Sequence, residues 1–453
     1  MIGKLSLSEF AHRTGGELFG SDAQFSEIST DSRSIVSGDL YLCLIGEHYD
    51  GHDFVQAAVD GGAVAVVASK AVESSISALQ VNDTHMALGA LALINRQRSD
   101  ATIIALTGSQ GKTTVKEMAG AILSNRAKTL ITSKNLNNTI GVPLTLLQLK
   151  DQKFAVIEMG ANGAGEIAFS VGIAQPDIVL ITKASAAHIE GFGSLQGIVE
   201  AKGEILDGLG GSGVAVLNAD DENVGQWQQR ASNSKVVLFS LLEKANSQYF
   251  SSEIDLSVIG EVSFKLHCPK GNAQVHLKMM GEHNIANAVS AAALAIEVGA
   301  SLDDVVKGLA SLMPIEGRLK LRDGINGCVL IDDTYNASPD SFYSAIDALM
   351  SFSGRKIVIA GDMKELGGES EESHLNVGRY ALQAKVDEFW ATGELSKSAV
   401  DAFGKRARYF ESQKELIERC RTAANQDAVF LVKGSRGAMM ENIINELLIK
   451  EAI

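Results

Sequence analysis

The sequence predicts an α/β protein with three domains, and two observations support this fold class. The chain has 453 residues, more than one hydrophobic core usually serves. Short apolar runs rich in β-branched residues alternate with helical stretches along its length, as in parallel sheets covered by helices. We expect a small α/β domain over 1–84, a central domain with a mostly parallel sheet over 85–313, and a doubly wound, Rossmann-like domain over 314–453.

The elements predicted for the first hundred residues precede the stretch TGSQGKTT, residues 107–114. Residues 26–69 carry short β-rich runs between clusters of Gly, Ser and Asp, which predicts the small α/β domain. A helix over about 84–98 precedes ATIIALTG, 101–108, a run with the length of a buried parallel strand. TGSQGKTT is therefore a strand-to-helix turn, because apolar residues then follow at helical spacing, namely Val115, Met118, Ala119, Ile122 and Leu123.

The later elements continue the same alternation. Buried-strand patterns recur at FAVIEMG (154–160), DIVLITKAS (177–185) and GVAVLNADDE (213–222). Alternating residues near 250–280 predict an antiparallel patch, and an alanine-rich helix follows over 284–299. After Pro314, four more strand patterns alternate with helices and predict the doubly wound domain: CVLIDDTYN, KIVIAGDM, EFWATG and DAVFLVKGS.

Composition excludes several classes of protein. The formal net charge is −15, and no run of Lys or Arg offers a nucleic-acid surface. The N-terminus lacks the apolar core of a secretion signal, and no stretch approaches the roughly 18 apolar residues of a membrane span, so we expect a cytoplasmic protein. We also expect a monomer. The cysteines are far apart and predict buried thiols rather than a zinc ribbon or disulfides: Cys43, Cys268, Cys328 and Cys420.

The triplet Gly111-Lys112-Thr113 suggests a phosphate loop, although the loop before it is short. A standard loop has a glycine six residues before its lysine, and Leu106 stands there. The alternative is an ordinary glycine-rich turn. A place between strand and helix favours phosphate, because backbone N–H groups converge on an anion and the helix dipole adds to them. Lys112 would then neutralise the β- and γ-phosphates, and the Thr113 hydroxyl would reach Mg²⁺.

Two further side chains follow predicted strands near the phosphate loop. Glu158 ends a buried strand, at the sheet edge where doubly wound proteins bind ligands. It could instead cap a helix or lie on the surface. His188 follows another strand end in KASAAHIEGFGS, and a single histidine is more often a structural residue than a ligand.

These motifs together resemble the Mur ligases of peptidoglycan precursor synthesis, in family order and over nearly the whole chain. The short phosphate loop is that family's own form. The TDSR and GEHYDGHDF segments favour a muramyl substrate, and GDMKELG, 361–367, favours the members that add a dipeptide. The remaining motifs that carry the resemblance are NLNNTIGVP, EMGANGAGEI, AHIEGFGS, EAKGEI, GEHNIANAVSAA, GRL, DDTYNASPDS and KGSR.

The resemblance implies a nucleotide site shared by two domains. Asn284 and Asn287 match residues that approach adenine, or they could form interhelical hydrogen bonds. Arg318 matches an arginine that reaches the γ-phosphate from the third domain. Asp333 matches a residue that contacts the ribose, although Asp332 and Asp333 could simply cap the next helix. ATP itself would lie over Gly108, Ser109, Gln110, Gly111, Lys112, Thr113 and Thr114.

The resemblance also implies a magnesium site and a modified lysine. Thr113, Glu158 and His188 match positions that hold Mg²⁺. Lys202 matches a lysine that carries a carbamate in related ligases, which converts a cation into a metal-binding anion. The alternative is an ordinary solvated helix lysine. The implied catalytic residues are Lys112, His188, Lys202 and Arg318.

Substrate residues are implied in all three domains. Residues of the first domain match places where relatives hold the uridine diphosphate, although turn chemistry would also explain them: Ser32, Arg33, Glu47, His48 and Tyr49. Asn137, Asn138 and Thr139 are expected to face the same substrate. Lys433, Ser435 and Arg436 are predicted to open the final helix and to receive the carboxylate of an incoming dipeptide.

The implied reaction is amide formation through an acyl phosphate, with release of ADP and phosphate. UDP-N-acetylmuramoyl-tripeptide supplies the carboxylate and D-alanyl-D-alanine the amine, and the third tripeptide residue is either diaminopimelate or lysine. One domain would hold the sugar nucleotide, one the ATP, and the third would close over them. The rivals are another Mur ligase, a folylpolyglutamate synthetase, or a nucleotide-gated binding or transport module. The last leaves Glu158, His188 and Lys202 without a purpose.

Overall fold

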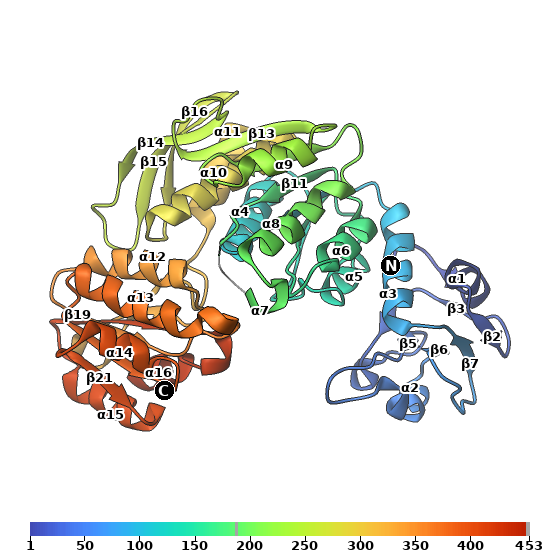
Figure 1. Ribbon diagram of the computed structural model, residues 1–453. Coiled ribbons are helices and arrows are strands. Elements are labelled where there is room, and N and C mark those ends of the chain that lie inside the picture. The colour runs from blue at the N-terminus through green and yellow to red at the C-terminus, as the bar shows by residue number, and fades with distance from the viewer. Residues whose placement is uncertain (186–188, 450–453) are drawn as a thin grey trace.

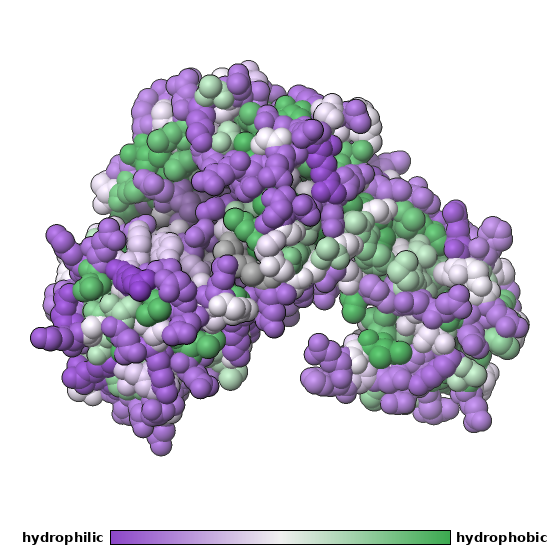
Figure 2. Space-filling model, viewed as in Figure 1, coloured by the Kyte–Doolittle hydropathy of each residue, from purple (hydrophilic) through white to green (hydrophobic). Residues whose placement is uncertain are grey.

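The computed structural model describes residues 1–185 and 189–449 and confirms the predicted three-domain α/β architecture. The domains form an arch, with the central domain at the top and the first and third domains on opposite sides below it (Figure 1). The visible face is predominantly hydrophilic, with apolar residues scattered over it (Figure 2). Within the described residues, no helix is long and apolar enough to cross a membrane.

The first domain is a small sheet of short strands. Its order is β2-β7-β6-β5-β4, parallel except for the pairing of β2 with β7. A two-stranded ribbon, β1 with β3, lies beside it. The bounds are β1 Leu5–Ser6, α1 Leu7–Thr14, β2 Glu17–Phe19, β3 Gln24–Phe25, β4 Ile28–Ser29, η1 Ser32–Ser34, β5 Leu40–Leu42, η2 Gly51–Phe54, α2 Val55–Asp60, β6 Ala65–Ala68 and β7 Ser77–Gln80.

The central domain has a nine-stranded sheet in the order β16-β15-β14-β13-β12-β11-β8-β10-β9. It is parallel from β9 to β14, and β14, β15 and β16 form the predicted antiparallel patch. The strands are β8 Thr102–Thr107, β9 Thr129–Ile131, β10 Phe154–Glu158, β11 Ile178–Ile181, β12 Val214–Asn218, β13 Lys235–Leu242, β14 Tyr249–Asp255, β15 Val262–Cys268 and β16 Gly271–Leu277.

Helices cover both faces of this sheet because its strands are apolar on both faces. Ile103 and Ala105 of β8 enter a core shared with α3 and α6, while Ile104 and Leu106 pack with α4, α10 and α11. The first core continues into the first domain, through α3. The helices are α3 Thr84–Gln97, α4 Lys112–Ser124, α5 Gly141–Leu146, α6 Glu166–Ala174, α7 Ile189–Phe192, α8 Leu195–Gly203, η3 Glu204–Gly208, α9 Val224–Arg230, α10 Glu282–Glu297 and α11 Leu302–Ser311.

The third domain is doubly wound around a sheet ordered β17-β18-β22-β19-β20-β21. The strands run parallel from β18 to β21, and β17 is an antiparallel edge strand. Its bounds are β17 Lys320–Asp323, η4 Ile325–Gly327, β18 Val329–Asp333, α12 Pro339–Met350, β19 Arg355–Ala360, η5 Gly367–Glu369, α13 Ser370–Gln383, β20 Glu388–Thr392, α14 Lys397–Phe403, β21 Ala407–Phe410, α15 Gln413–Ala423, β22 Ala428–Lys433, η6 Arg436–Ala438 and α16 Glu441–Leu447.

Two expectations differ from the structure. The final helix begins at Glu441, so Lys433, Ser435 and Arg436 do not open it: Lys433 is the last residue of β22, and a short 3-10 turn follows. Cys268 is only half-buried, because it ends β15 near the sheet edge, whereas the other three cysteines are buried.

Candidate active site

The phosphate loop begins at Gly108, directly after β8. Leu106, at the position of the missing glycine, is fully buried inside β8, so the strand continues past the point where a standard loop would start. Gly108 has φ 147°, and a Cβ there would lie 1.9 Å from Thr182 Oγ1. Gly111 has φ 80°, and a Cβ there would lie 2.5 Å from Asn287 Oδ1. Only glycine fits both places without strain.

Lys112 begins α4 and turns back over the loop. Its Nζ donates a hydrogen bond to the carbonyl oxygen of Gly108 at 2.7 Å. Enclosure by the cleft lowers the pKa of Lys112, and the nearby Glu158 opposes that shift. No carboxylate among the described residues forms an ion pair with its ammonium. A phosphate in the loop would supply the missing negative charge.

Glu158 is a buried carboxylate at the carboxyl end of β10. Its Oε1 accepts hydrogen bonds from Asn137 Nδ2 at 2.7 Å and from Thr113 Oγ1 at 3.3 Å. Its Oε2 is buried without a hydrogen-bond partner, and Lys116 Nζ lies 3.8 Å away. Glu158 is therefore neither a helix cap nor a surface residue.

The donor set around Glu158 suits magnesium. Mg²⁺ binds hard oxygen ligands, commonly one or two carboxylates together with phosphate oxygens and water. Glu158 Oε2 and the Thr113 hydroxyl are oxygens of this kind. In the described parts of the chain, no three His, Cys, Asp or Glu side chains gather as a metal cluster, so protein ligands alone would not complete a shell. His188, a predicted ligand, lies outside the described residues.

Lys202 is buried near the carboxyl end of α8, which contradicts the alternative of a solvated lysine. Its Nζ lies 5.1 Å from the centroid of the Phe192 ring. Burial, with a smaller contribution from Lys112, lowers the pKa of Lys202 to about 7. A substantial part of the amine is then uncharged at neutral pH.

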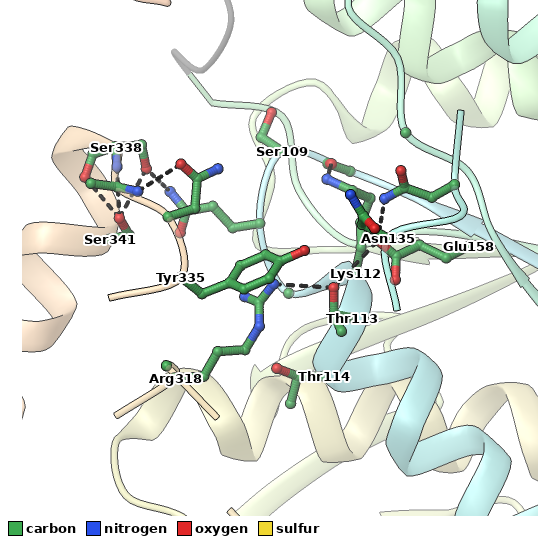
Figure 3. A pocket seen from close by; sticks show the side chains of 18 of the residues that line it. Ser109, Lys112, Thr113, Thr114, Asn135, Glu158, Arg318, Tyr335, Ser338 and Ser341 are labelled. Atoms are coloured by element: carbon green, nitrogen blue, oxygen red, sulfur yellow. Dashed lines mark hydrogen bonds between the residues drawn. The ribbon is translucent and has the colours of Figure 1, made fainter. Parts of the chain in front are cut away.

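The third domain places an arginine against the phosphate loop. Arg318 Nη2 donates to Thr113 Oγ1 at 3.1 Å, and the guanidinium lies 4.5 Å from the centroid of the Tyr335 ring. Figure 3 shows Arg318 and Tyr335 together facing Thr113 and Lys112. The third domain touches the loop again through Ser338, whose Oγ accepts a hydrogen bond from Gln110 Nε2 at 3.1 Å.

Asp333 ends β18 and is held inside the third domain. Its Oδ1 accepts from the Leu319 N–H at 3.2 Å, and its Oδ2 accepts from Lys433 Nζ at 2.6 Å. Asp332 Oδ1 accepts from the Thr334 hydroxyl at 2.7 Å. Neither carboxylate caps α12, because Ser338 forms the cap there. The capping alternative is therefore wrong.

Asn284 and Asn287 lie on the first two turns of α10, beside the loop. Asn284 Nδ2 donates to the Met280 carbonyl oxygen at 2.8 Å, and Asn287 Nδ2 donates to Asn284 Oδ1 at 3.2 Å. These bonds stay within one segment, which does not support interhelical bonding.

One cleft of about 320 Å³ joins most of the predicted residues. It is lined from the central domain and from the third domain. The predicted residues that line it are Gly108, Ser109, Gln110, Gly111, Lys112, Thr113, Thr114, Asn137, Asn138, Glu158, Lys202, Asn284, Asn287, Arg318, Asp333 and Lys433.

Other predicted residues do not line this cleft. The Thr139 carbonyl oxygen faces His85 Nε2 at 3.0 Å, and Arg436 pairs with Glu441. Arg33 pairs with Asp31 on the surface of the first domain. No described residue of the first domain lines the cleft, and the first and third domains lie on opposite sides of the arch (Figure 1). Among the predicted residues that the structure describes, those outside the lining are Ser32, Arg33, Glu47, His48, Tyr49, Thr139, Ser435 and Arg436.

The cleft also contains residues that were not predicted. Nearly all of them belong to the sequence motifs that resemble those of the Mur ligases, so membership of these motifs could have identified them as site residues. Burial lowers the pKa of one of them, His283. They are Asn135, Gly160, Ala161, Asn162, Glu166, His283, Gly317, Leu319, Tyr335, Asn336, Ala337, Ser338, Ser341, Ser344, Lys364, Glu365 and Leu366.

A phosphate loop on one domain and an arginine on another is an arrangement that lets domain closure assemble the site and exclude water. The fold and cleft thus define an enzyme that uses a nucleotide between two domains. Residues 24–97 match the domain described as "Mur ligase family, catalytic domain", 106–295 the "Mur ligase middle domain" and 317–436 the "Mur ligase, glutamate ligase domain". The chain belongs to the Mur ligase family.

Relatives within the family match over nearly the whole length. The chain is 42% identical over 446 residues to the UDP-N-acetylmuramoyl-tripeptide--D-alanyl-D-alanine ligase of Escherichia coli (strain K12), covering 98% of each chain. A crystal structure of MurF from Acinetobacter baumannii superimposes with a TM-score of 0.93 and 36% identity, covering 98% of this chain and 99% of that one. MurF ligase from Thermotoga maritima, solved in complex with ADP, has a TM-score of 0.84 and 27% identity over 93% and 96% of the two chains.

Proposed function

We propose that this chain is the ATP-dependent ligase that joins D-alanyl-D-alanine to UDP-N-acetylmuramoyl-tripeptide in peptidoglycan precursor synthesis. The observation that carries the proposal is the cleft in which Lys112 and Arg318, from different domains, both contact the phosphate loop, where Thr113 donates to the buried Glu158. The whole-length similarity to ligases named for this reaction supports the same substrates.

The reaction needs ATP because a carboxylate has no leaving group that an amine can displace. The terminal carboxylate of the tripeptide attacks the γ-phosphorus, the bond to the β-γ bridging oxygen breaks, and ADP leaves. In this proposal, Lys112 and Arg318 would offset the charge that develops on the transferred phosphoryl group. The dipeptide amine then attacks the acyl carbon, loses a proton and expels phosphate from the tetrahedral intermediate.

Thr113 and Glu158 are the described residues suited to hold Mg²⁺, and His188 stays a prediction. When bound, this ion would neutralise charge on the phosphate oxygens. A carbamate on Lys202 would add a further anionic oxygen ligand. Lys202 suits that modification, because only an uncharged amine adds CO₂, and its pKa near 7 makes that form available.

The three domains divide the substrates in this proposal. Residues 1–84 hold the uridine diphosphate through the predicted residues between Ser32 and Tyr49, residues 85–313 hold ATP, and residues 314–453 close over the cleft. The predicted first-domain residues lie outside the cleft, so the sugar nucleotide would have to extend from the first domain to the cleft. We place the enzyme in the cytoplasm, and the monomeric state stays a prediction.

The test is ADP formation from ATP with UDP-N-acetylmuramoyl-tripeptide, varying the amine. We expect ADP release with D-alanyl-D-alanine and little with single amino acids, and a comparison of diaminopimelate and lysine tripeptides identifies the third residue. Equal ADP release with a single amino acid would indicate a different Mur ligase. ADP release that needs no amine would favour the nucleotide-gated module.

A further inference from the structure

Among the described residues, five lysine or arginine side chains line the cleft, and four of them already have a role or a partner. Lys112 and Arg318 converge on the phosphate loop. Lys202 is buried against Phe192, and Lys433 donates to Asp333 Oδ2 and to the Asn336 carbonyl oxygen. Each of these four side chains therefore already has a partner within the protein, either a hydrogen-bond acceptor or an aromatic ring.

Lys364 is the fifth cation and differs from the others. It lies in the GDMKELG segment, after β19, and it is exposed while lining the cleft. Within the part of the chain that the structure describes, its ammonium has no ion-pair or hydrogen-bond partner. An exposed cation of this kind can bind an anion without first breaking an internal ion pair.

The backbone that carries Lys364 is firmly anchored. Its own N–H donates to Ser435 Oγ at 2.8 Å, and the preceding N–H, of Met363, donates to His374 Nε2 at 2.9 Å. Asp362 Oδ1 accepts from the N–H and the hydroxyl of Ser396 at 2.9 and 2.8 Å. A free side chain on a fixed backbone is a suitable design for a binding residue.

The position of the ammonium is also defined. A Cβ on Gly437 would lie 2.9 Å from Lys364 Nζ, so the glycine leaves the space that the ammonium occupies. Lys364 Nζ therefore lies against η6. Its location is at the third-domain side of the cleft, across from the phosphate loop on the central domain.

We propose that Lys364 binds the carboxylate of the incoming dipeptide and so selects an acceptor with a free carboxyl end. This proposal rests on the ligase function above. The amine of the acceptor must reach the acyl carbon near Arg318, while its carboxylate lies at the other end of the molecule. Lys364 supplies a charge-assisted hydrogen bond there. Of the residues predicted for this task, Lys433 is neutralised by Asp333 and Arg436 points to Glu441.

The test compares D-alanyl-D-alanine with D-alanyl-D-alaninamide, which lacks the carboxylate, in the wild type and in Lys364→Met. Methionine keeps much of the side-chain length and removes the charge. A charge-assisted hydrogen bond corresponds to a preference of about 10-fold to 100-fold in kcat/KM for the free acid in the wild type. In Lys364→Met we expect that preference to disappear through a higher KM for the free acid, with kcat and the KM for ATP unchanged.

Two further variants serve as controls for Lys364→Met. Arg436→Met removes an exposed cation next to Gly437 and should keep the wild-type preference for the free acid. Lys364→Arg should restore part of the preference, because it restores the charge. An undiminished preference in Lys364→Met, or an equal loss of kcat for both acceptors, would overturn the assignment. A wild-type chain that releases no ADP with D-alanyl-D-alanine would refute the ligase function and this assignment with it.

Discussion

The change Lys112→Met is expected to abolish activity while leaving the stability of the folded protein nearly unchanged. The Lys112 ammonium has one protein hydrogen bond, to the Gly108 carbonyl oxygen, and no ion-pair partner among the described residues. Its pKa is lowered mainly by burial, which means that the folded chain holds this charge at a cost. Methionine of similar length removes the charge and leaves the β8 to α4 turn intact. We therefore expect a folded protein that has lost activity.

The size of the loss follows from the contact that Lys112 would make with a phosphate. Two unit charges about 4 Å apart interact by about 4 kcal/mol at an effective dielectric constant near 20. Each 1.36 kcal/mol corresponds to a tenfold change in rate, so kcat/KM for ATP should fall about 1,000-fold. The melting temperature should fall by no more than about 3 °C, which corresponds to about 1 kcal/mol for a domain of this size.

The assay pairs steady-state ADP formation with thermal unfolding, and Lys116→Met is the matched control. Lys116 lies one turn further along α4 and is fully buried, with Nζ 2.9 Å from Glu117 Oε1 and 3.8 Å from Glu158 Oε2. Removing one partner of a buried ion pair costs about 3–5 kcal/mol, so this variant should be much less stable. Wild-type activity in Lys112→Met would refute the phosphate-loop assignment. If Lys112→Met lost as much stability as Lys116→Met, the argument that the folded chain holds the Lys112 charge at a cost would be refuted.

Three further predictions concern other residues. Arg318→Ala should lower kcat by about 100-fold to 1,000-fold, because a guanidinium hydrogen-bonded to Thr113 of the phosphate loop would face the transferred phosphoryl group; steady-state kinetics that show only a raised KM would contradict this. Lys202→Ala should be inactive and regain activity with a short carboxylic acid such as acetate, and full activity without the acid would demote Lys202 to a structural residue. Burial lowers the pKa of His374, whose ordinary value is 6.5, so the unfolded chain binds a proton that the folded chain does not, and stability falls as the pH drops below 6.5. Denaturant unfolding across pH should show a shallower fall in His374→Gln, and an identical slope would exclude the effect.

The fold was predictable where strands are buried on both faces. Strands such as β8, β10, β11 and β12 lie inside a parallel sheet and read as continuous apolar runs. The edge strands β17 and β21, KLRD and ARYF, have half-exposed or exposed charged residues and lack this signal. The strands of the first domain have two to four residues, too few for a periodic pattern.

The site was predictable where local sequence places a residue on a strand end or helix start. Lys112, Thr113 and Glu158 are of this kind, because each follows a recognisable strand or turn. The pairing of Lys433 with Asp333 joins residues 100 positions apart, and no local pattern indicates it. Lys364 lines the cleft only because the third domain faces the central one, so its proximity to the phosphate loop depends on tertiary structure.

The most direct test of the proposed ligase follows the oxygen atoms of the tripeptide's terminal carboxylate. That carboxylate is labelled with ¹⁸O, the enzyme is supplied with ATP and D-alanyl-D-alanine, and the inorganic phosphate is analysed by mass spectrometry. Because the carboxylate oxygen forms the bond to the γ-phosphorus and leaves with it, one ¹⁸O should appear in phosphate for each amide bond formed. Label found in AMP, or phosphate without label, would contradict the acyl phosphate route and the role assigned to this cleft.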